Sequence, residues 1–402
     1  MNTSLRNYFV VTGGYWAFTI TDGAIRMLVV LYFHLLGYSP LQVAMLFLFY
    51  EFFGIVTNLV GGWLGARIGL NRTMNIGMAM QVVALLALTV PDAWLSVGYV
   101  MAAQALSGIA KDLNKMSAKA SVKAISQSGD ASLFKWVAIL TGSKNALKGL
   151  GFFIGAALLQ WLSFRSGLLV LSGMLFMALL ITLWMLPADV GKMKSKPKFS
   201  QVFSPVKAVN ILSAARFFLF GSRDIWFVVG LPVFLTEKLG WDFYKVGGFI
   251  ALWVIGYGII QTLSPKLLRQ HQPNGTSARY WALMLAIVPA GIALALQQGL
   301  TTEFVIIVGL IVFGAIFAIN SAIHSYLILA YSDHDKIAMN VGFYYMSNAG
   351  GRLAGTVLSG WLYQAYGLVG CLWWSCAFLL MAGVISFLLP QNINNDTKYH
   401  AN

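Results

Sequence analysis

The chain has 402 residues, of which 58% are hydrophobic and only 10% are charged. A soluble domain carries about 25% charged residues, so this sequence has too little charge to cover a water-exposed surface. It predicts an integral membrane protein with many spans. The formal net charge of +14 first suggests a nucleic-acid binder, but the distribution of the basic residues, described below, argues against that class.

Twelve apolar runs follow one another along the chain. A helix needs about 20 apolar residues to cross a bilayer, and runs of that length favour helices over a barrel. The first run is read as a retained span and not as a signal peptide, because no small-residue cleavage site follows it. The predicted spans are Tyr8–Leu36, Pro40–Ile68, Thr73–Val90, Ala93–Asn114, Phe134–Leu162, Gly167–Leu186, Val209–Leu235, Phe243–Leu263, Tyr280–Leu296, Glu303–Leu329, Ala338–Tyr366 and Leu368–Leu389.

A polar, lysine-rich segment divides these spans into six and six. We therefore predict an N-terminal bundle over residues 1–187, a basic linker over 188–207 and a C-terminal bundle with a short tail over 208–402. With the N-terminus placed in the cytoplasm, seventeen of the 27 Lys and Arg residues fall at cytoplasmic ends and three at outer ends. Because basic residues stay on the cytoplasmic side, both termini are predicted to be cytoplasmic, and most of the basic excess is a signal of topology.

The two halves repeat. Leu36-Gly37-Tyr38-Ser39-Pro40 joins the first two spans, and Leu239-Gly240-Trp241-Asp242-Phe243 joins the seventh and eighth in a similar pattern. Gly151 and Gly155 in span five likewise match Gly351 and Gly355 in span eleven. Two six-span halves in parallel repeat resemble the major facilitator superfamily, whose fold places the substrate site near the midplane between the halves.

The loop between spans two and three supports this resemblance. Gly62 to Gly69 is similar to the cytoplasmic loop motif of that superfamily, in which a glycine is followed by an acidic residue, an arginine and a second glycine. Ala66 stands where the acidic residue is usual, so the usual latch is in doubt. Arg67 remains, and we assign it to conformational gating.

Charged residues inside the spans carry the functional argument. Charge at mid-bilayer costs roughly 3 kcal/mol or more and normally faces a partner or a water-filled cavity. Seven basic residues lie there against four acidic ones, a difference of three positive charges. That surplus predicts a cavity for an anion with more than one negative charge. The basic residues are Arg26, Lys111, Lys144, Lys148, Arg216, Arg223 and Arg352, and the acidic residues are Asp22, Glu51, Asp112 and Asp224.

Helical spacing assigns roles to these residues. Lys144 and Lys148 are one turn apart, so an anion between them would relieve their repulsion. Arg is suited to bidentate binding of oxyanions and Lys acts as a point charge. We therefore predict that the substrate is bound by Arg26, Lys144, Lys148, Arg216, Arg223, Asn348 and Arg352.

Other readings of the same residues stay open. Asp22 and Arg26, four residues apart, are equally well a structural ion pair, and Arg216 at the end of its span could snorkel. Arg223 and Asp224 are sequence neighbours whose side chains point in different directions, so each needs a partner elsewhere. Lys111 and Asp112 are assigned, with Arg67, to a gate at the cytoplasmic mouth.

The carboxylates are candidates for proton coupling. Asp22, Glu51 and Asp224 could each change protonation between transport states, although a neighbouring cation could equally neutralise Glu51. His324 could relay protons or serve as a packing residue. The sequence has no nucleotide-binding loop, dinucleotide fingerprint or serine-centred elbow, and Cys371 and Cys376 have no zinc or disulfide spacing. We therefore expect no enzyme activity, no cofactor and no metal.

Several longer segments resemble a narrower group. They are Thr21–Val29, Tyr50–Gly62, Ala103–Met116, Phe134–Gly149 and Phe220–Trp226. Together they are similar to the organoarsenical efflux permeases called ArsJ, over nearly the whole chain. The resemblance implies a bacterial inner-membrane exporter of an arsenylated phosphoglycerate, 1-arseno-3-phosphoglycerate. A glyceraldehyde-3-phosphate dehydrogenase makes this compound from arsenate and is thus a functional partner, and export confers arsenate resistance.

Two alternatives remain at this point. The same fold and the same cations would serve a transporter or exchanger of organophosphates or other organic anions. A non-transporting assembly factor or receptor is a third class, in which the buried charges would be structural and should balance.

Overall fold

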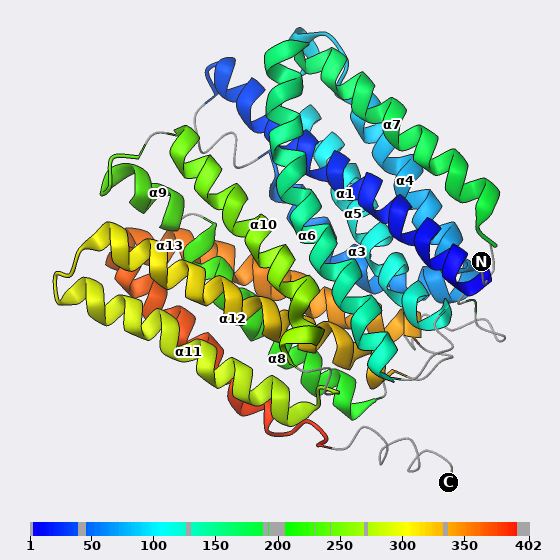
Figure 1. The fold of residues 1–402 in the computed structure, drawn as a ribbon. Coiled ribbons are helices and arrows are strands. Elements are labelled where there is room, and N and C mark those ends of the chain that lie inside the picture. Colours follow the sequence, from blue (N-terminus) through cyan, green and yellow to red (C-terminus); the bar gives the residue numbers. More distant parts are fainter. Residues whose placement is uncertain are drawn as a thin grey trace. The chain divides into compact units, whose positions relative to one another are not determined.

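The computed structural model describes residues 3–38, 46–125, 130–187, 192, 206–228, 230–241, 243–268, 272–332 and 337–391. Within these ranges every regular element is a helix. The helices, shown in Figure 1, are α1 (Thr3–Leu35), α3 (Leu48–Ile68), α4 (Leu70–Ala87), η1 (Asp92–Trp94), α5 (Val97–Ile125), α6 (Asp130–Trp161), α7 (Phe164–Met185), α8 (Lys207–Phe227), α9 (Gly230–Glu237), α10 (Phe243–Leu267), α11 (Gly275–Gln297), α12 (Thr302–Ala330) and α13 (Ile337–Ser386).

The all-helical fold class is confirmed. The α13 label covers two helices, because Gly367 has φ 63° and ψ −166° and interrupts the helical backbone. The predicted spans eleven and twelve meet at this residue. Most of the predicted linker, the start of the second span at Pro40 and the tail beyond residue 391 lie outside the described residues.

The chain divides into two compact units. Unit 1 comprises Met1–Gly129, Ser143–Phe203 and Asp333–Met346, and unit 2 comprises Asp130–Gly142, Ser204–Ser332 and Ser347–Asn402. The first part of α6 therefore belongs to unit 2 and the first part of α13 to unit 1. The division into bundles at residues 188–207 stays a prediction.

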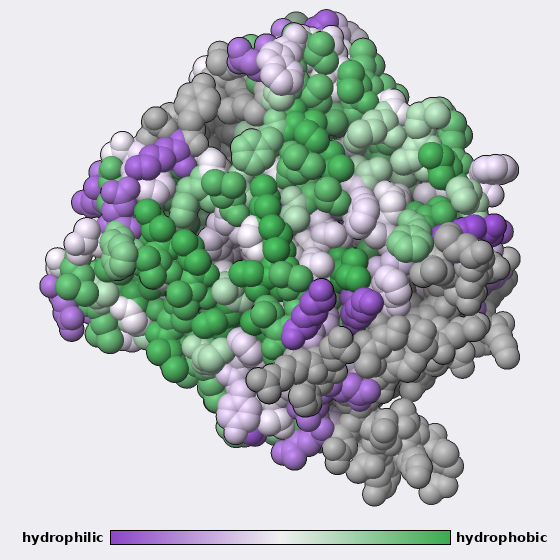
Figure 2. Space-filling view, in the orientation of Figure 1, coloured by the Kyte–Doolittle hydropathy of each residue, from purple (hydrophilic) through white to green (hydrophobic). Residues whose placement is uncertain are grey.

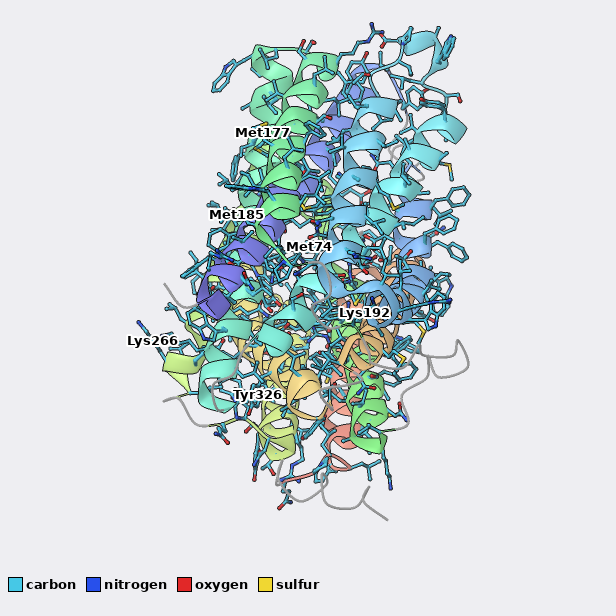
Figure 3. The ribbon with its side chains drawn as sticks, turned by 90° about the vertical axis from the view of Figure 1, so that its right-hand side faces the viewer. Met74, Met177, Met185, Lys192, Lys266 and Tyr326 are labelled. Carbon is cyan, nitrogen blue, oxygen red and sulfur yellow. The ribbon has the colours of Figure 1, made fainter. Side chains whose placement is uncertain are left out.

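In unit 1, α5 packs against α3 and α4, and α7 packs against α1 and α4. Figure 3 marks the α4 and α7 pair by Met74, Met177 and Met185. A Cβ atom on Gly14 of α1 would lie 2.9 Å from Thr182 of α7 and 3.6 Å from Met74. The absence of a side chain at Gly14 thus lets three helices meet closely.

In unit 2, α12 packs against α10 and α11. Its core is rich in aromatic rings: Trp226 contacts Phe313 with ring centroids 4.9 Å apart, and Phe313 stacks on Phe317 at 5.6 Å. Aromatic pairs of this kind add to the stability gained from burial. They give α8 and α12 a fixed mutual position, which matters for the charged residues described below.

Large apolar side chains remain exposed along several helices, as Figure 2 shows on the face seen there. On α7 they include Leu183 and Trp184, and on α11 Ile287 is 69% exposed. Such surfaces suit a lipid environment. By length and composition, five helices of the described chain qualify as membrane spans: Phe164–Met185, Gly248–Leu267, Gly275–Gln297, Thr302–Ala330 and Met339–Ser386. The count of twelve spans stays a prediction.

The repeat seen in the sequence has a backbone counterpart. Gly37 and Gly240 close equivalent turns with φ of 84° and 64°. These angles are easily adopted only by glycine, so the glycine in each repeat is required by the turn. The neighbouring residues 39–45 and 242 lie outside the described residues.

Candidate functional site

In unit 1 the charged residues are positioned by close contact between α1 and α6. A Cβ atom on Gly151 would lie 2.6 Å from the carbonyl oxygen of Ile20, and one on Gly23 would lie 2.6 Å from that of Lys148. Real Cβ atoms do not approach so closely, so both positions need glycine. The two backbones can therefore touch where Asp22 and Lys148 lie.

Asp22 is at the centre of this contact. Its carboxylate lies 3.1 Å from Nζ of Lys148 and accepts a hydrogen bond from the hydroxyl of Tyr50. The side chain of Asp22 is 3% exposed and that of Lys148 is 19% exposed. The carboxylate is thus enclosed, while part of the lysine remains accessible.

Arg26, one turn beyond Asp22, reaches α3. Its Nη2 lies 2.6 Å from Oε1 of Glu51, and Nζ of Lys111 lies 3.7 Å from Oε2 of the same residue. Glu51 therefore has two basic side chains beside it. The ring of Tyr50 lies 4.4 Å from the Arg26 guanidinium and 3.8 Å from the Lys111 ammonium. Sequence spacing gave no signal for Tyr50, because these contacts come from two other helices, α1 and α5.

The predicted gating residues separate into two places. Asp112 is buried and lies 3.5 Å from Lys111 and 2.5 Å from Lys115. Arg67 instead stacks on Trp63, 5.1 Å from its ring, in the last turn of α3 before Gly69. Lys115, one of the seventeen basic residues predicted to lie at cytoplasmic ends, belongs to the charged network. We call Asp22, Arg26, Tyr50, Glu51, Lys111, Asp112, Lys115 and Lys148 the unit 1 cluster.

Lys144 lies one turn before Lys148 on α6 and is partly exposed. Lys144 and Lys148 therefore lie on the same face of one helix, as their spacing predicted. Trp16 of α1 donates a hydrogen bond of 2.8 Å to Ser143, the residue before Lys144. This bond joins α1 to α6 directly beside Lys144.

In unit 2 the glycines of α13 repeat the arrangement of α6. A Cβ atom on Gly355 would lie 2.6 Å from the carbonyl oxygen of Gly221 and 3.0 Å from Cβ of Asp224. A Cβ atom on Gly351 would lie still closer, 2.1 Å from the carbonyl oxygen of Phe217. The sequence match between Gly151, Gly155 and these residues therefore reflects two equivalent helix contacts.

Asp224 lies at this second contact and binds two arginines. Its Oδ1 lies 2.5 Å from Nη2 of Arg223 and accepts a 2.7 Å hydrogen bond from Nε of the same residue. Its Oδ2 accepts a 3.1 Å hydrogen bond from Nε of Arg352. The expectation that Arg223 and Asp224 point apart was wrong, because the long arginine side chain folds back over the carboxylate. The expectation of a further partner for Asp224 was right.

Arg216 is nearly enclosed, with 3% of the residue exposed. Its Nε donates a 2.9 Å hydrogen bond to Oδ1 of Asn348, and Nη1 lies 3.4 Å from the hydroxyl of Ser321. The guanidinium also lies 3.7 Å from the Phe220 ring. Arg216 therefore does not snorkel, and Asn348 orients it. We call Arg216, Arg223, Asp224 and Arg352 the unit 2 cluster.

His324, on α12 in unit 2, is fully buried. Neither ring nitrogen has a hydrogen-bond partner within the described ranges. Cys371 and Cys376 are free thiols. Across the part of the chain that the structure describes, no three or more His, Cys, Asp or Glu side chains gather as metal ligands.

The structure thus defines a helical membrane protein in which each unit holds a group of charged side chains among its helices. The sequence matches the Major Facilitator Superfamily over residues 11–334. The chain belongs to this superfamily, whose members are secondary transporters, and it is a multi-pass membrane protein.

Solved structures agree with the family. The crystal structure of the human organic anion transporter MFSD10 (TETRAN) covers 96% of this chain and 100% of its own, with a TM-score of 0.78 and 15% sequence identity. The proton:xylose symporter XylE covers 96% and 97%, with a TM-score of 0.77 and 11% identity. A bacterial homologue of the iron transporter ferroportin covers 94% and 98%, with a TM-score of 0.74 and 15% identity. At these identities the likeness shows the fold alone. No functionally curated protein matches the sequence.

Proposed function

We propose that this transporter exports an organic anion that carries more than one negative charge. The observation that carries the proposal is the balance of charge inside each unit. The unit 1 cluster has four basic residues and three carboxylates, and the unit 2 cluster has three basic residues and one carboxylate. An excess of buried positive charge needs an anionic ligand or water to be stable.

The accessibility of these side chains supports binding. The side chains of Arg26, Lys148, Arg223 and Arg352 are 25%, 19%, 16% and 30% exposed, whereas those of Asp22 and Asp224 are 3% and 1% exposed. Lys148, Arg223 and Arg352 are therefore more exposed than the carboxylates that hold them, whereas Arg26 and its partner Glu51 are equally exposed. This arrangement suits anions and disfavours cationic substrates.

For the substrate we propose 1-arseno-3-phosphoglycerate, on the resemblance to the ArsJ permeases. This compound carries two tetrahedral oxyanion groups at opposite ends, so a transporter with several separated cations suits it. A glyceraldehyde-3-phosphate dehydrogenase would form it in the cytoplasm. After export the acyl arsenate hydrolyses, and arsenate is lost from the cell.

We further propose a bacterial inner-membrane location with both termini cytoplasmic and with proton coupling. The distribution of Lys and Arg along the sequence supports the orientation. Glu51 is the best candidate for the proton site, since its side chain is 25% exposed and water can reach it. Asp22 is more enclosed and holds Lys148.

Survival on arsenate tests the proposal. The gene is expressed in an arsenate-sensitive bacterium with and without a co-expressed glyceraldehyde-3-phosphate dehydrogenase. We expect resistance only when both are present. The Lys148→Ala variant should reach the membrane in normal amount and give no resistance, because it removes the accessible cation held by Asp22. Resistance that does not need the dehydrogenase would contradict the organoarsenical substrate and indicate direct arsenate export.

The second candidate is an organophosphate transporter or exchanger, which the same basic residues would serve. Proteoliposomes loaded with phosphate distinguish the two. Uptake of a phosphorylated acid driven by the outward phosphate gradient would favour exchange. Its absence, together with dehydrogenase-dependent arsenic release, would favour export.

A further inference from the structure

The two arginines of the unit 2 cluster share one carboxylate. Arg223 precedes Asp224 on α8, Arg352 comes from α13, and both bind opposite oxygens of Asp224. Two guanidinium groups this close would repel each other, and the single negative charge between them offsets that repulsion. One positive charge remains over the three side chains, on two groups that are each partly exposed.

Aromatic rings hold Arg223 from other sides. Its guanidinium carbon lies 5.2 Å from the Phe220 ring, 5.5 Å from Phe317 and 5.7 Å from Phe227. Distances within about 6 Å permit cation–π attraction. The rings also exclude water from one side of the guanidinium, which strengthens its electrostatic interaction with any anion on the open side.

The position of Arg352 is fixed by helix packing. Gly355 lies one turn beyond Arg352 and lets α13 approach the backbone of α8 at Gly221 and Asp224. A larger residue there would separate the helices and draw Arg352 away from the carboxylate. The pair of arginines is therefore a built arrangement of two helices and not a chance meeting of long side chains.

We propose that Arg223 and Arg352, held together by Asp224, form a subsite for a tetrahedral dianion such as a phosphoryl or arsenyl group. The inference rests on the proposed function and names the chemical group that unit 2 recognises. Guanidinium groups match such oxyanions with paired hydrogen bonds. A tetrahedral group offers three terminal oxygens, so each arginine has oxygens of its own, whereas a carboxylate has only two to share.

Asp224 acts in this subsite as a positioning residue. Its side chain is 1% exposed, and both oxygens are occupied by arginines. We therefore assign proton coupling to other carboxylates and expect Asp224 to keep its charge through the cycle.

Binding to the purified full-length protein in nanodiscs tests the subsite. The probes are 3-phosphoglycerate, inorganic phosphate and glycerate, which lacks the phosphoryl group, and affinity is measured by calorimetry. Arg223→Gln and Arg352→Gln should each weaken binding of the two phosphate-bearing probes by about tenfold or more, and change glycerate binding by less than about twofold. Lys245→Gln, which removes a cation from an exposed ion pair with Glu303 in the same unit, is the control and should bind as the wild type does.

Each result decides the inference. Equal losses for glycerate and for the phosphate-bearing probes would overturn it, as would a wild-type protein that binds no phosphate-bearing probe. If phosphate-bearing probes bind selectively but arsenate survival never requires the dehydrogenase, the subsite stands and the proposed substrate fails. Asp224→Asn should weaken phosphate binding and leave the shape of the pH profile of transport unchanged. A flattened profile would show that Asp224 carries the proton.

Discussion

Tyr50 connects most of the unit 1 cluster. Its hydroxyl binds Asp22, and its ring contacts both Arg26 and Lys111. Tyr50→Phe removes only the hydrogen bond to a charged group, worth about 1.5–3 kcal/mol, so transport efficiency should fall about tenfold or more. Tyr50→Leu also removes the ring and should lose more. Initial rates in everted vesicles measure both, with the exposed Tyr366→Phe as control. Equal activity of the Phe and Leu variants would show that the ring does not position the cations.

Glu51 differs from the other carboxylates of the site in its accessibility. It lies between Arg26 and Lys111 and is 25% exposed, so it can take up a proton when an anion draws those cations away. Glu51→Gln should therefore flatten the pH dependence of transport. The measurement is the rate in vesicles from acid to neutral pH, with Asp92→Asn, an exposed carboxylate paired with Arg165, as the control. An unchanged pH profile would leave the role to Asp22.

At this scale the sequence identifies charges but not their partners. Each of the seven basic and four acidic residues predicted to lie in the spans was visible as a charged residue in an apolar run. Which carboxylate meets which cation depends on helix rotation and on contacts between helices far apart in the chain. That is why Tyr50 and Lys115 were missed, and why the direct pairing of Arg223 with Asp224 was not expected.

At the scale of the helices, glycine contacts set the positions of the charged residues. Gly355→Ala would place a Cβ atom 2.6 Å from the Gly221 carbonyl oxygen, and such overpacking costs about 1–3 kcal/mol. We expect a lower thermal midpoint for the solubilised protein and weaker phosphate binding. Gly360→Ala, on the same helix, meets nothing within 4 Å and should be neutral or stabilising. Equal midpoints for both variants would mean that α13 can shift without cost.

These contacts also show what a repeat in a sequence can predict. Gly151 and Gly155 were matched to Gly351 and Gly355 from spacing alone, and both pairs prove to be sites where a fifth helix of a half meets its first helix. The end of the eleventh predicted span at Tyr366 was likewise correct, because Gly367 leaves the helical conformation. Repeated glycines and turn glycines can be recognised from the residues themselves, without knowledge of which helices pack together. A single sequence can therefore predict them.

At the scale of the whole molecule, the surplus of positive charge has a consequence for energetics. A transporter that exports net negative charge is driven outward by an inside-negative membrane potential. One net charge at 100 mV contributes about 2.3 kcal/mol, which corresponds to about a fifty-fold concentration ratio at equilibrium. Proteoliposomes that enclose the dehydrogenase, its cofactor, glyceraldehyde 3-phosphate and arsenate allow the arsenic released to be measured under a potassium diffusion potential set with valinomycin.

We expect an inside-negative potential to raise arsenic release several-fold and an inside-positive potential to lower it, with no pH gradient imposed. Liposomes with the Lys148→Ala variant serve as the control for leakage, because that protein should not bind the anion. If protons or phosphate moved in exact compensation for the anion, release would be insensitive to the potential. Such a result would favour electroneutral exchange over net anion export, since the cations in the two units would then only select the substrate and not determine the charge moved per cycle.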